Sequence, residues 1–90
     1  MVFPHQADIR LAKQRLLEKA RLQGANLTRA SLQQSNLRLA DLSHSTLIAI
    51  QGWGLFAQGA QFEKADLSAA YLQFARLSGA SMHQANLRAA

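Results

Sequence analysis

Residues 65–87 read Ala65-Asp66-Leu67, Ala70-Tyr71-Leu72, Ala75-Arg76-Leu77, Ala80-Ser81-Met82 and Ala85-Asn86-Leu87, with two residues between successive triplets. A small residue recurs at every fifth position, and a large apolar residue follows two positions later. Five residues advance an α-helix by about 1.4 turns, so this spacing would scatter the large side chains around a helix. A strand period of two fits no better. The period predicts a polygonal solenoid in which each unit forms one side and turns its small and large apolar residues inward.

The five-residue frame extends well beyond this stretch. It begins at Ala20 and continues without a shift to residue 89, which gives 14 units, and 12 of them have a large apolar centre. A chain of 90 residues is too short for a large globular core, but stacked coils can bury their apolar residues against one another. The expected interior residues are Leu22, Leu27, Leu32, Leu37, Leu42, Leu47, Phe62, Leu67, Leu72, Leu77, Met82 and Leu87.

These units resemble the pentapeptide-repeat family, whose consensus is Ala, then Asp or Asn, then Leu or Phe, then two variable residues. The resemblance covers about three quarters of the chain. It implies an all-β solenoid, a right-handed, four-sided β-helix with four units per coil and therefore about 3.5 coils, in which residues twenty apart stack. Some family members imitate duplex DNA and bind DNA gyrase, a topoisomerase. That mimicry requires an acidic surface, whereas this chain has a net charge of +5.

Residues 50–59 interrupt the pattern, because Gly52 and Ala57 occupy the two central positions where leucine is expected. Either the coil narrows there, or the segment leaves the frame as a loop that glycines permit. In a loop, Trp53 and its neighbours would form an apolar tip. The tip would either fold back and plug the core or stay exposed and bind a partner.

The aromatic residues gather on the side of the solenoid that contains this interruption. With twenty residues per coil, Trp53 shares a face with Tyr71 and Phe74. Large apolar patches on protein surfaces mark interaction sites, so this side is the expected partner surface. Its candidate residues are Ile50, Trp53, Leu55, Phe56, Tyr71 and Phe74.

Residues 1–19 form a separate N-terminal segment in this interpretation, and residues 20–90 form the repeat domain. Asp8 is a candidate N-cap, and Ile9, Ala12 and Leu16 recur at helical spacing. The sequence therefore predicts a short capping α-helix over residues 8–19 that lies on the open first coil, with a free basic arm as the alternative.

Positive charge is densest over residues 10–21, which have a net charge of +4. Arg10, Lys13, Arg15 and Lys19 could contact phosphates and give weak, salt-dependent nucleic-acid binding. The structural alternative is a solvated helix face, because the aromatic residues lie elsewhere and offer no stacking platform beside the basic cluster.

The C-terminal end of the solenoid has no capping element in the sequence. Leu72, Leu77, Met82 and Leu87 would form an uncovered apolar end. Two chains could stack end to end through it as a closed homodimer. The alternative is that the sequence is a fragment of a longer solenoid.

No motif indicates catalysis, a cofactor or a metal site. His44 and His83 are expected two coils apart, about 10 Å by strand spacing, which is too far to share one metal ion. Asp41 and Glu63 share a convex side that offers no enclosed cleft for acid and base catalysis. Asn26, Asn36, Asp41, Asp66 and Asn86 are interpreted as turn residues that satisfy the backbone.

The remaining composition is consistent with a non-enzymatic protein. The chain has no cysteine, which favours the cytoplasm, and no apolar run near the roughly 20 residues that span a membrane. The sequence therefore predicts a protein–protein interaction scaffold of unknown partner. A nucleic-acid-associated protein is the alternative, and a topoisomerase-binding DNA mimic has the wrong charge.

Overall fold

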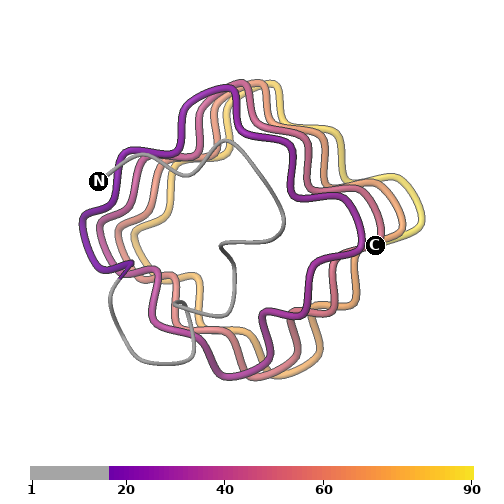
Figure 1. Cartoon of the computed structure of the whole chain (residues 1–90), viewed down its shortest axis with the longest axis horizontal. Coiled ribbons are helices and arrows are strands. Elements are labelled where there is room, and N and C mark those ends of the chain that lie inside the picture. The colour runs from indigo at the N-terminus through magenta and orange to yellow at the C-terminus, as the bar shows by residue number, and fades with distance from the viewer. Residues whose placement is uncertain (1–16) are drawn as a thin grey trace.

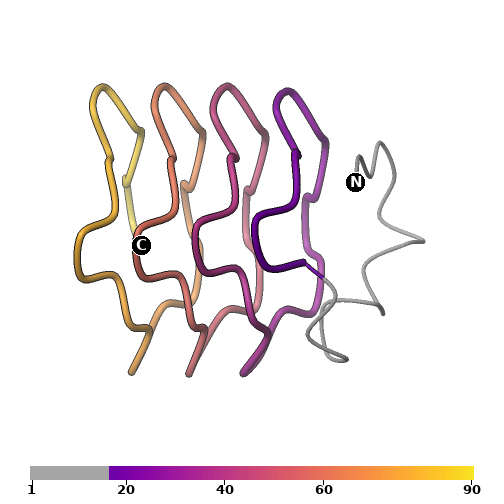
Figure 2. The ribbon, with the colours of Figure 1, turned by 90° about the vertical axis from the view of Figure 1, so that its left-hand side faces the viewer.

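The computed structural model describes residues 17–90, which wind into stacked coils with four sides (Figure 1). Within this range there is no helix, and the sheet pairing consists of single-residue parallel bridges between residues twenty apart. The bridges run from Arg21 paired with Asp41 to Asp66 paired with Asn86. The expected repeat of four units per coil is therefore confirmed. Figure 2 shows the coils side by side along the solenoid axis.

Backbone hydrogen bonds connect each coil to the next at three positions of a unit. In the unit that begins at Ala40, Asp41 N donates to Ala20 O of the preceding coil at 3.0 Å. Leu42 N and His44 N donate to Gln61 O and Glu63 O of the following coil at 2.7 and 2.8 Å. The same pattern recurs along the chain, so the coils are held together in the way that parallel strands are.

Each corner of the coil is a four-residue turn. The N–H of the first residue of a unit donates to the carbonyl of the third residue of the unit before, as in Ala25 N to Leu22 O at 3.0 Å. The residue just before the donor has a positive φ, between 57° and 71° in every described unit. Type II turns require a positive φ at this position. The corners are therefore made by the fifth residue of each unit, and not by the small inward residues alone.

The side chain of a polar second residue accepts a hydrogen bond from a backbone N–H that has no backbone acceptor. The side-chain Oδ1 atoms accept from the backbone N–H two residues later at 3.0 to 3.2 Å. Asx turns of this kind suit Asn and Asp. The interpretation as turn residues is confirmed for all five predicted positions, namely Asn26, Asn36, Asp41, Asp66 and Asn86.

The interior of the solenoid is a column of leucines bordered by small residues. The predicted central residues from Leu22 to Leu67 are buried, as are most of the small residues at the first position. Burial of each such leucine stabilises the fold by about 2 kcal/mol. At the C-terminal end the burial fades, since Leu72, Leu77 and Met82 are half-buried and Leu87 is exposed.

Residues 50–59 remain in the five-residue frame. Gln51 and Phe56 form bridges to both neighbouring coils, and Leu55 N donates to Gly52 O at 3.1 Å, as in an ordinary corner. The loop alternative is therefore wrong. Gly54 and Gly59 are fifth residues with the usual positive φ.

Ile50 and Leu55 replace the missing core leucines. Both occupy the first position of their unit, where the other units have Ala or Ser, and both are buried. Ile50 Cδ1 lies 3.4 Å from the point that a Cβ on Gly52 would occupy. Large and small residues have exchanged places, so the interior volume is kept while the coil stays in register.

The predicted boundary between residues 19 and 20 is wrong. Ala20 N donates to Leu17 O at 2.9 Å, and Lys19 N donates to Arg38 O at 2.9 Å. Leu17 is buried as the centre of a unit. Residues 17–19 therefore belong to the solenoid and not to a helix, while residues 8–16 of the predicted capping helix lie outside the described residues. None of the described residues belongs to a helix long and apolar enough to cross a membrane.

Candidate functional site

The surface has an open groove of about 490 Å³ that spans two coils. We call it the aromatic groove; its lining residues are Gln51, Trp53, Tyr71, Gln73 and Phe74. They come from two units twenty residues apart, residues 50–54 and 70–74. The coil register alone brings them together, because Gln51 lies beside Tyr71 in a parallel bridge.

The three aromatic side chains of the groove are exposed to solvent. Trp53 is 45% exposed, Tyr71 56% and Phe74 87%. Phe74 also adopts a φ of 63°, which is uncommon for a bulky residue. Its side chain therefore contributes little to the core, and the groove concentrates apolar surface that the fold itself does not bury.

The described residues on the face that carries the groove, in units 30–34, 50–54 and 70–74, include no charged side chain. Its outward positions hold glutamines, a serine, a glycine and the three aromatic residues. Gln33 Nε2 donates to Gln51 Oε1 at 2.9 Å, and Gln33 Oε1 is buried without a hydrogen-bond partner. The groove can therefore offer stacking surfaces and side-chain amides, but no ionic contact of its own.

The predicted partner surface is only partly present. Trp53, Tyr71 and Phe74 meet at the groove, as the twenty-residue register predicts. The prediction is wrong for Ile50 and Leu55, because they point into the core and are 1% exposed.

Phe56 lies on the next side of the coil and contacts two arginines. The Cζ atoms of Arg38 and Arg76 lie 4.8 and 5.3 Å from the centroid of its ring. The sequence reasoning missed this cluster. The signal was available, since Arg76 stands twenty residues after Phe56.

The C-terminal end of the solenoid forms a second hollow of about 440 Å³. It is lined by Ala70, Tyr71, Leu72, Gln73, Ala89 and Ala90, so it shares Tyr71 and Gln73 with the aromatic groove. Leu72, Leu77 and Met82 are half-buried beside it, and Leu87 is 43% exposed. The apolar C-terminal end of the solenoid is thus continuous with the aromatic groove.

The basic residues predicted to contact phosphates are only partly described. Lys19 is exposed at the first described corner. Arg10, Lys13 and Arg15 lie outside the described residues, so the nucleic-acid alternative stays a prediction.

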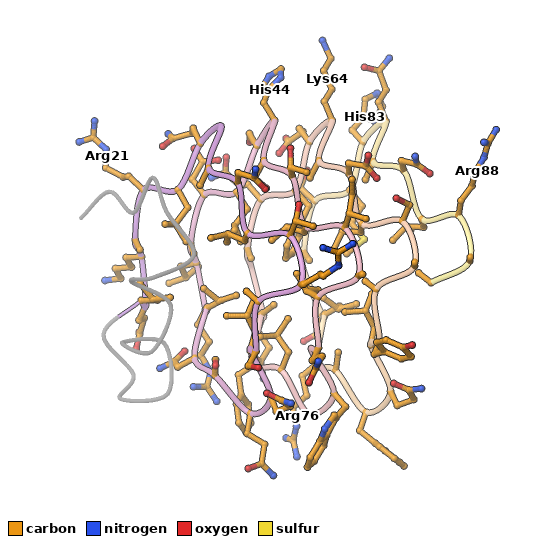
Figure 3. All side chains as sticks on the ribbon, turned by 45° about the vertical axis from the view of Figure 1, so that its right-hand side comes forward. Arg21, His44, Lys64, Arg76, His83 and Arg88 are labelled. Atoms are coloured by element: carbon orange, nitrogen blue, oxygen red, sulfur yellow. The ribbon has the colours of Figure 1, made fainter. Side chains whose placement is uncertain are left out.

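Figure 3 shows His44, Lys64 and His83 together at one corner of the coil, on the opposite side from Arg76. Among residues 17–90, no three His, Cys, Asp or Glu side chains are grouped as a metal site would need. Glu63 accepts from Ser81 Oγ at 2.9 Å and from Ser43 Oγ at 3.4 Å. The Ser68 hydroxyl and backbone N–H lower the pKa of Asp66 below its ordinary value. These carboxylates join coils or turns and enclose no cleft.

The repeat geometry agrees with the comparison to known protein families. A sequence model of the pentapeptide repeats matches eight copies, over residues 16–48 and 57–90. The chain belongs to the pentapeptide-repeat family. Pentapeptide repeats generally form right-handed quadrilateral β-helices and typically act as non-enzymatic scaffolds for protein interaction. A search of curated proteins found no match to this chain.

The gap between the two matched ranges covers most of the exchanged pair of units. The pentapeptide-repeat pattern expects a large apolar centre, which Gly52 does not supply. Nevertheless, the backbone turns and bridges continue through the gap. The sequence pattern is therefore interrupted between the two matched ranges, whereas the fold continues there without interruption.

Proposed function

We propose that this chain is a non-enzymatic protein-interaction scaffold that binds its partner at the aromatic groove. The observation that carries the proposal is the exposure of Trp53, Tyr71 and Phe74 around one hollow. Tyrosine and tryptophan are enriched among the residues that dominate binding energy at interfaces. The typical role of the family supports the proposal.

The chemistry of the groove favours an apolar anchor on the partner. A partner side chain that fills the hollow would displace water from the three rings. The amides of Gln51 and Gln73 would then hydrogen-bond the partner's polar groups at the border. None of the residues that line the groove carries a charge that would need to be desolvated, which removes one cost of binding.

The test is affinity capture from a cell extract, followed by binding measurements with the purified captured protein. Trp53→Ala should weaken that binding at least about tenfold, because it removes a central ring. The unfolding midpoint should change little, since much of the ring is in water. Ile48→Ala is the matched control, because Ile48 is a partly exposed apolar residue on a side of the coil that has no proposed binding surface. Equal losses for both variants, or none for Trp53→Ala, would refute the proposal.

The N-terminal segment is proposed to cap the first coil, as the predicted helix over residues 8–16. Leu22, Leu27 and Leu32 are fully buried although no described coil precedes them. Removal of residues 1–16 should therefore lower the free energy of unfolding by about 2 kcal/mol or more. An unchanged denaturation midpoint would contradict this role.

The apolar C-terminal end is proposed to mediate a homodimer by end-to-end stacking. The half-buried Leu72, Leu77 and Met82, together with the exposed Leu87, support it. A two-fold pairing would cover both ends at once and leave no surface for further growth.

A further inference from the structure

The side of the coil formed by residues 35–39, 55–59 and 75–79 holds two arginines against one aromatic ring. We call this side the arginine face. Arg38 lies one coil before Phe56 and Arg76 one coil after it, so each neighbouring coil contributes one guanidinium to the ring. Both Cζ atoms lie within about 6 Å of the ring centroid, the range of a cation–π contact.

Contact with the ring orients the arginines without using their hydrogen-bond donors. A guanidinium that lies over an aromatic face keeps its N–H groups available to bind a carboxylate with two hydrogen bonds. The four carboxylates in the described part of the chain all accept from uncharged groups. Glu18 accepts from Asn36, Asp41 from Gln23, Glu63 from Ser81, and Asp66 from Ser68.

The spacing of the two cations fits a short acidic segment. From the two ring distances, the Cζ atoms lie no more than about 10 Å apart. In an extended peptide, side chains two residues apart point to the same side and are separated by about 7 Å. Two acidic residues with one residue between them could therefore reach both guanidinium groups.

The arginine face also provides room for a peptide backbone. Leu39 packs over Gly59, where an added Cβ would lie 2.7 Å from Leu39 Cδ2. At Gly79, an added Cβ would meet only the Gly59 backbone, at 3.8 Å or more. The fifth residues of this face therefore comprise one apolar side chain, Leu39, and two glycines whose backbone carries no side chain.

We propose that the arginine face binds an acidic, extended segment of a partner protein, with Arg38 and Arg76 each taking one carboxylate. Phe56 is a positioning residue, because it acts through the two arginines. A nucleic acid fits less well, since its backbone presents a dense row of phosphates. Residues 17–19 lie on the same side of the coil one turn earlier, and among the residues that the structure describes on this side Lys19 is the one further cation and Glu18 the one carboxylate.

The inference is independent of the proposed function at the aromatic groove. Phe56 does not line the groove, and none of the residues that line the groove is charged. Trp53→Ala should therefore leave acidic-peptide binding unchanged, which separates failure of one proposal from failure of the other.

The experiment measures fluorescence anisotropy of a dye-labelled peptide containing Glu-Gly-Glu, titrated with the full chain. Arg38→Gln and Arg76→Gln should each weaken binding about tenfold, the cost of one charge-assisted contact. A Gln-Gly-Gln peptide should not bind. The double variant Arg29→Gln/Arg88→Gln removes two positive charges from another side, one more than either single variant, and should still bind the Glu-Gly-Glu peptide as the natural chain does.

The role of Phe56 has its own variants. Phe56→Leu keeps an apolar side chain but removes the ring, and it should weaken binding several-fold, whereas Phe56→Tyr should retain it. Rescue by tyrosine would separate positioning of the arginines from a merely structural role, and circular dichroism checks that each variant is folded.

Three results would overturn the proposal. The first is no binding of the Glu-Gly-Glu peptide. The second is an equal loss for the Arg29/Arg88 double variant, which would mean that net charge alone is responsible. The third is tighter binding of a duplex oligonucleotide that Arg38→Gln and Arg76→Gln abolish, which would assign the face to nucleic acid.

Discussion

At the scale of the residue, the second and fourth positions of a unit depend on one another. The fourth N–H points away from both neighbouring coils, and the Oδ1 atom of Asn or Asp accepts from it. Where a unit has another residue at its second position, this N–H must be satisfied in a different way, for example by water. In units with Asn or Asp at the second position, a side-chain oxygen thus takes the place of a backbone carbonyl as the acceptor of one hydrogen bond.

Asp41 allows this contribution to be measured. Asp41→Ala removes the acceptor for Ser43 N–H and for Gln23 Nε2, so the free energy of unfolding should fall by about 1 kcal/mol. Gln61→Ala is the matched control, because Gln61 is the stacked second residue of the next coil. Urea denaturation measures both variants. Equal effects would mean that the aspartate bonds contribute nothing specific.

Asp66 predicts a dependence of stability on pH. Its folded-state pKa is lowered from the ordinary 3.8 by the hydrogen bonds from Ser68. The stabilising contribution is therefore complete above that ordinary value and is lost as the pH falls through the lowered folded-state pKa. Between pH 5 and about pH 2 to 3, the thermal midpoint should fall further for the natural chain than for Asp66→Asn. The prediction fails if both midpoints fall equally.

The fifth residue could not have been recognised as the corner from the sequence. Eleven of the described fifth residues with positive φ are not glycine, and they include Lys64, His44 and Phe74. These residue types favour no turn when they are considered one at a time. The inter-coil hydrogen bonds impose the conformation, and those bonds form only after the coils have stacked.

At the scale of the element, the five-residue unit tolerates two arrangements of its inward pair. Most units have a small first residue and a large third residue, whereas residues 50–54 and 55–59 have the reverse. The sequence analysis predicted the frame and the register, because the spacing of the leucines determines both. It did not identify Ile50 and Leu55 as core residues, because it assigned large core side chains only to the third position of each unit.

The same reasoning explains why the site was predicted in part. Trp53, Tyr71 and Phe74 follow from the register alone, since their positions point outward in every unit. Ile50 and Leu55 were included in the surface because the loop alternative would place them in an apolar tip. The shape of the groove depends on side-chain packing between coils, which the sequence pattern does not contain.

The reversal of large and small residues can be tested by restoring the common arrangement. Leu55→Ala should cost about 2 to 5 kcal/mol, because it leaves a cavity beside Ala57. The double variant Leu55→Ala/Ala57→Leu returns a large residue to the centre and should recover most of that loss. Chemical denaturation of the natural chain, Leu55→Ala, Ala57→Leu and the double variant measures the coupling. A double variant no more stable than Leu55→Ala would contradict the exchange.

At the scale of the whole molecule, the two ends of the described solenoid differ in burial. Leu22, Leu27 and Leu32 of the first coil are fully buried, whereas Leu87 of the last coil is 43% exposed. Burial of apolar surface drives most protein association. The C-terminal end is therefore where the free energy of assembly would be gained.

A charged substitution tests this assembly. The double variant Met82→Glu/Leu87→Glu places carboxylates at the C-terminal end and should convert the proposed dimer to a monomer. Ala49→Glu adds a charge to a side of the coil and should leave the dimer intact. Light scattering over about a hundredfold range of concentration reports the mass. A natural chain that is monomeric throughout that range would contradict the dimer.

The register of twenty residues has a consequence for how such a chain can change in length. Each coil bonds only to the coils directly before and after it, through the same backbone positions. A duplication of any twenty consecutive residues within the described solenoid, wherever it begins, therefore adds one complete coil and keeps every outward column aligned. A duplication whose length is a multiple of five but not of twenty would keep the core but move the surface columns to different sides. Gene duplication in this protein can thus copy a binding surface only in steps of one whole coil.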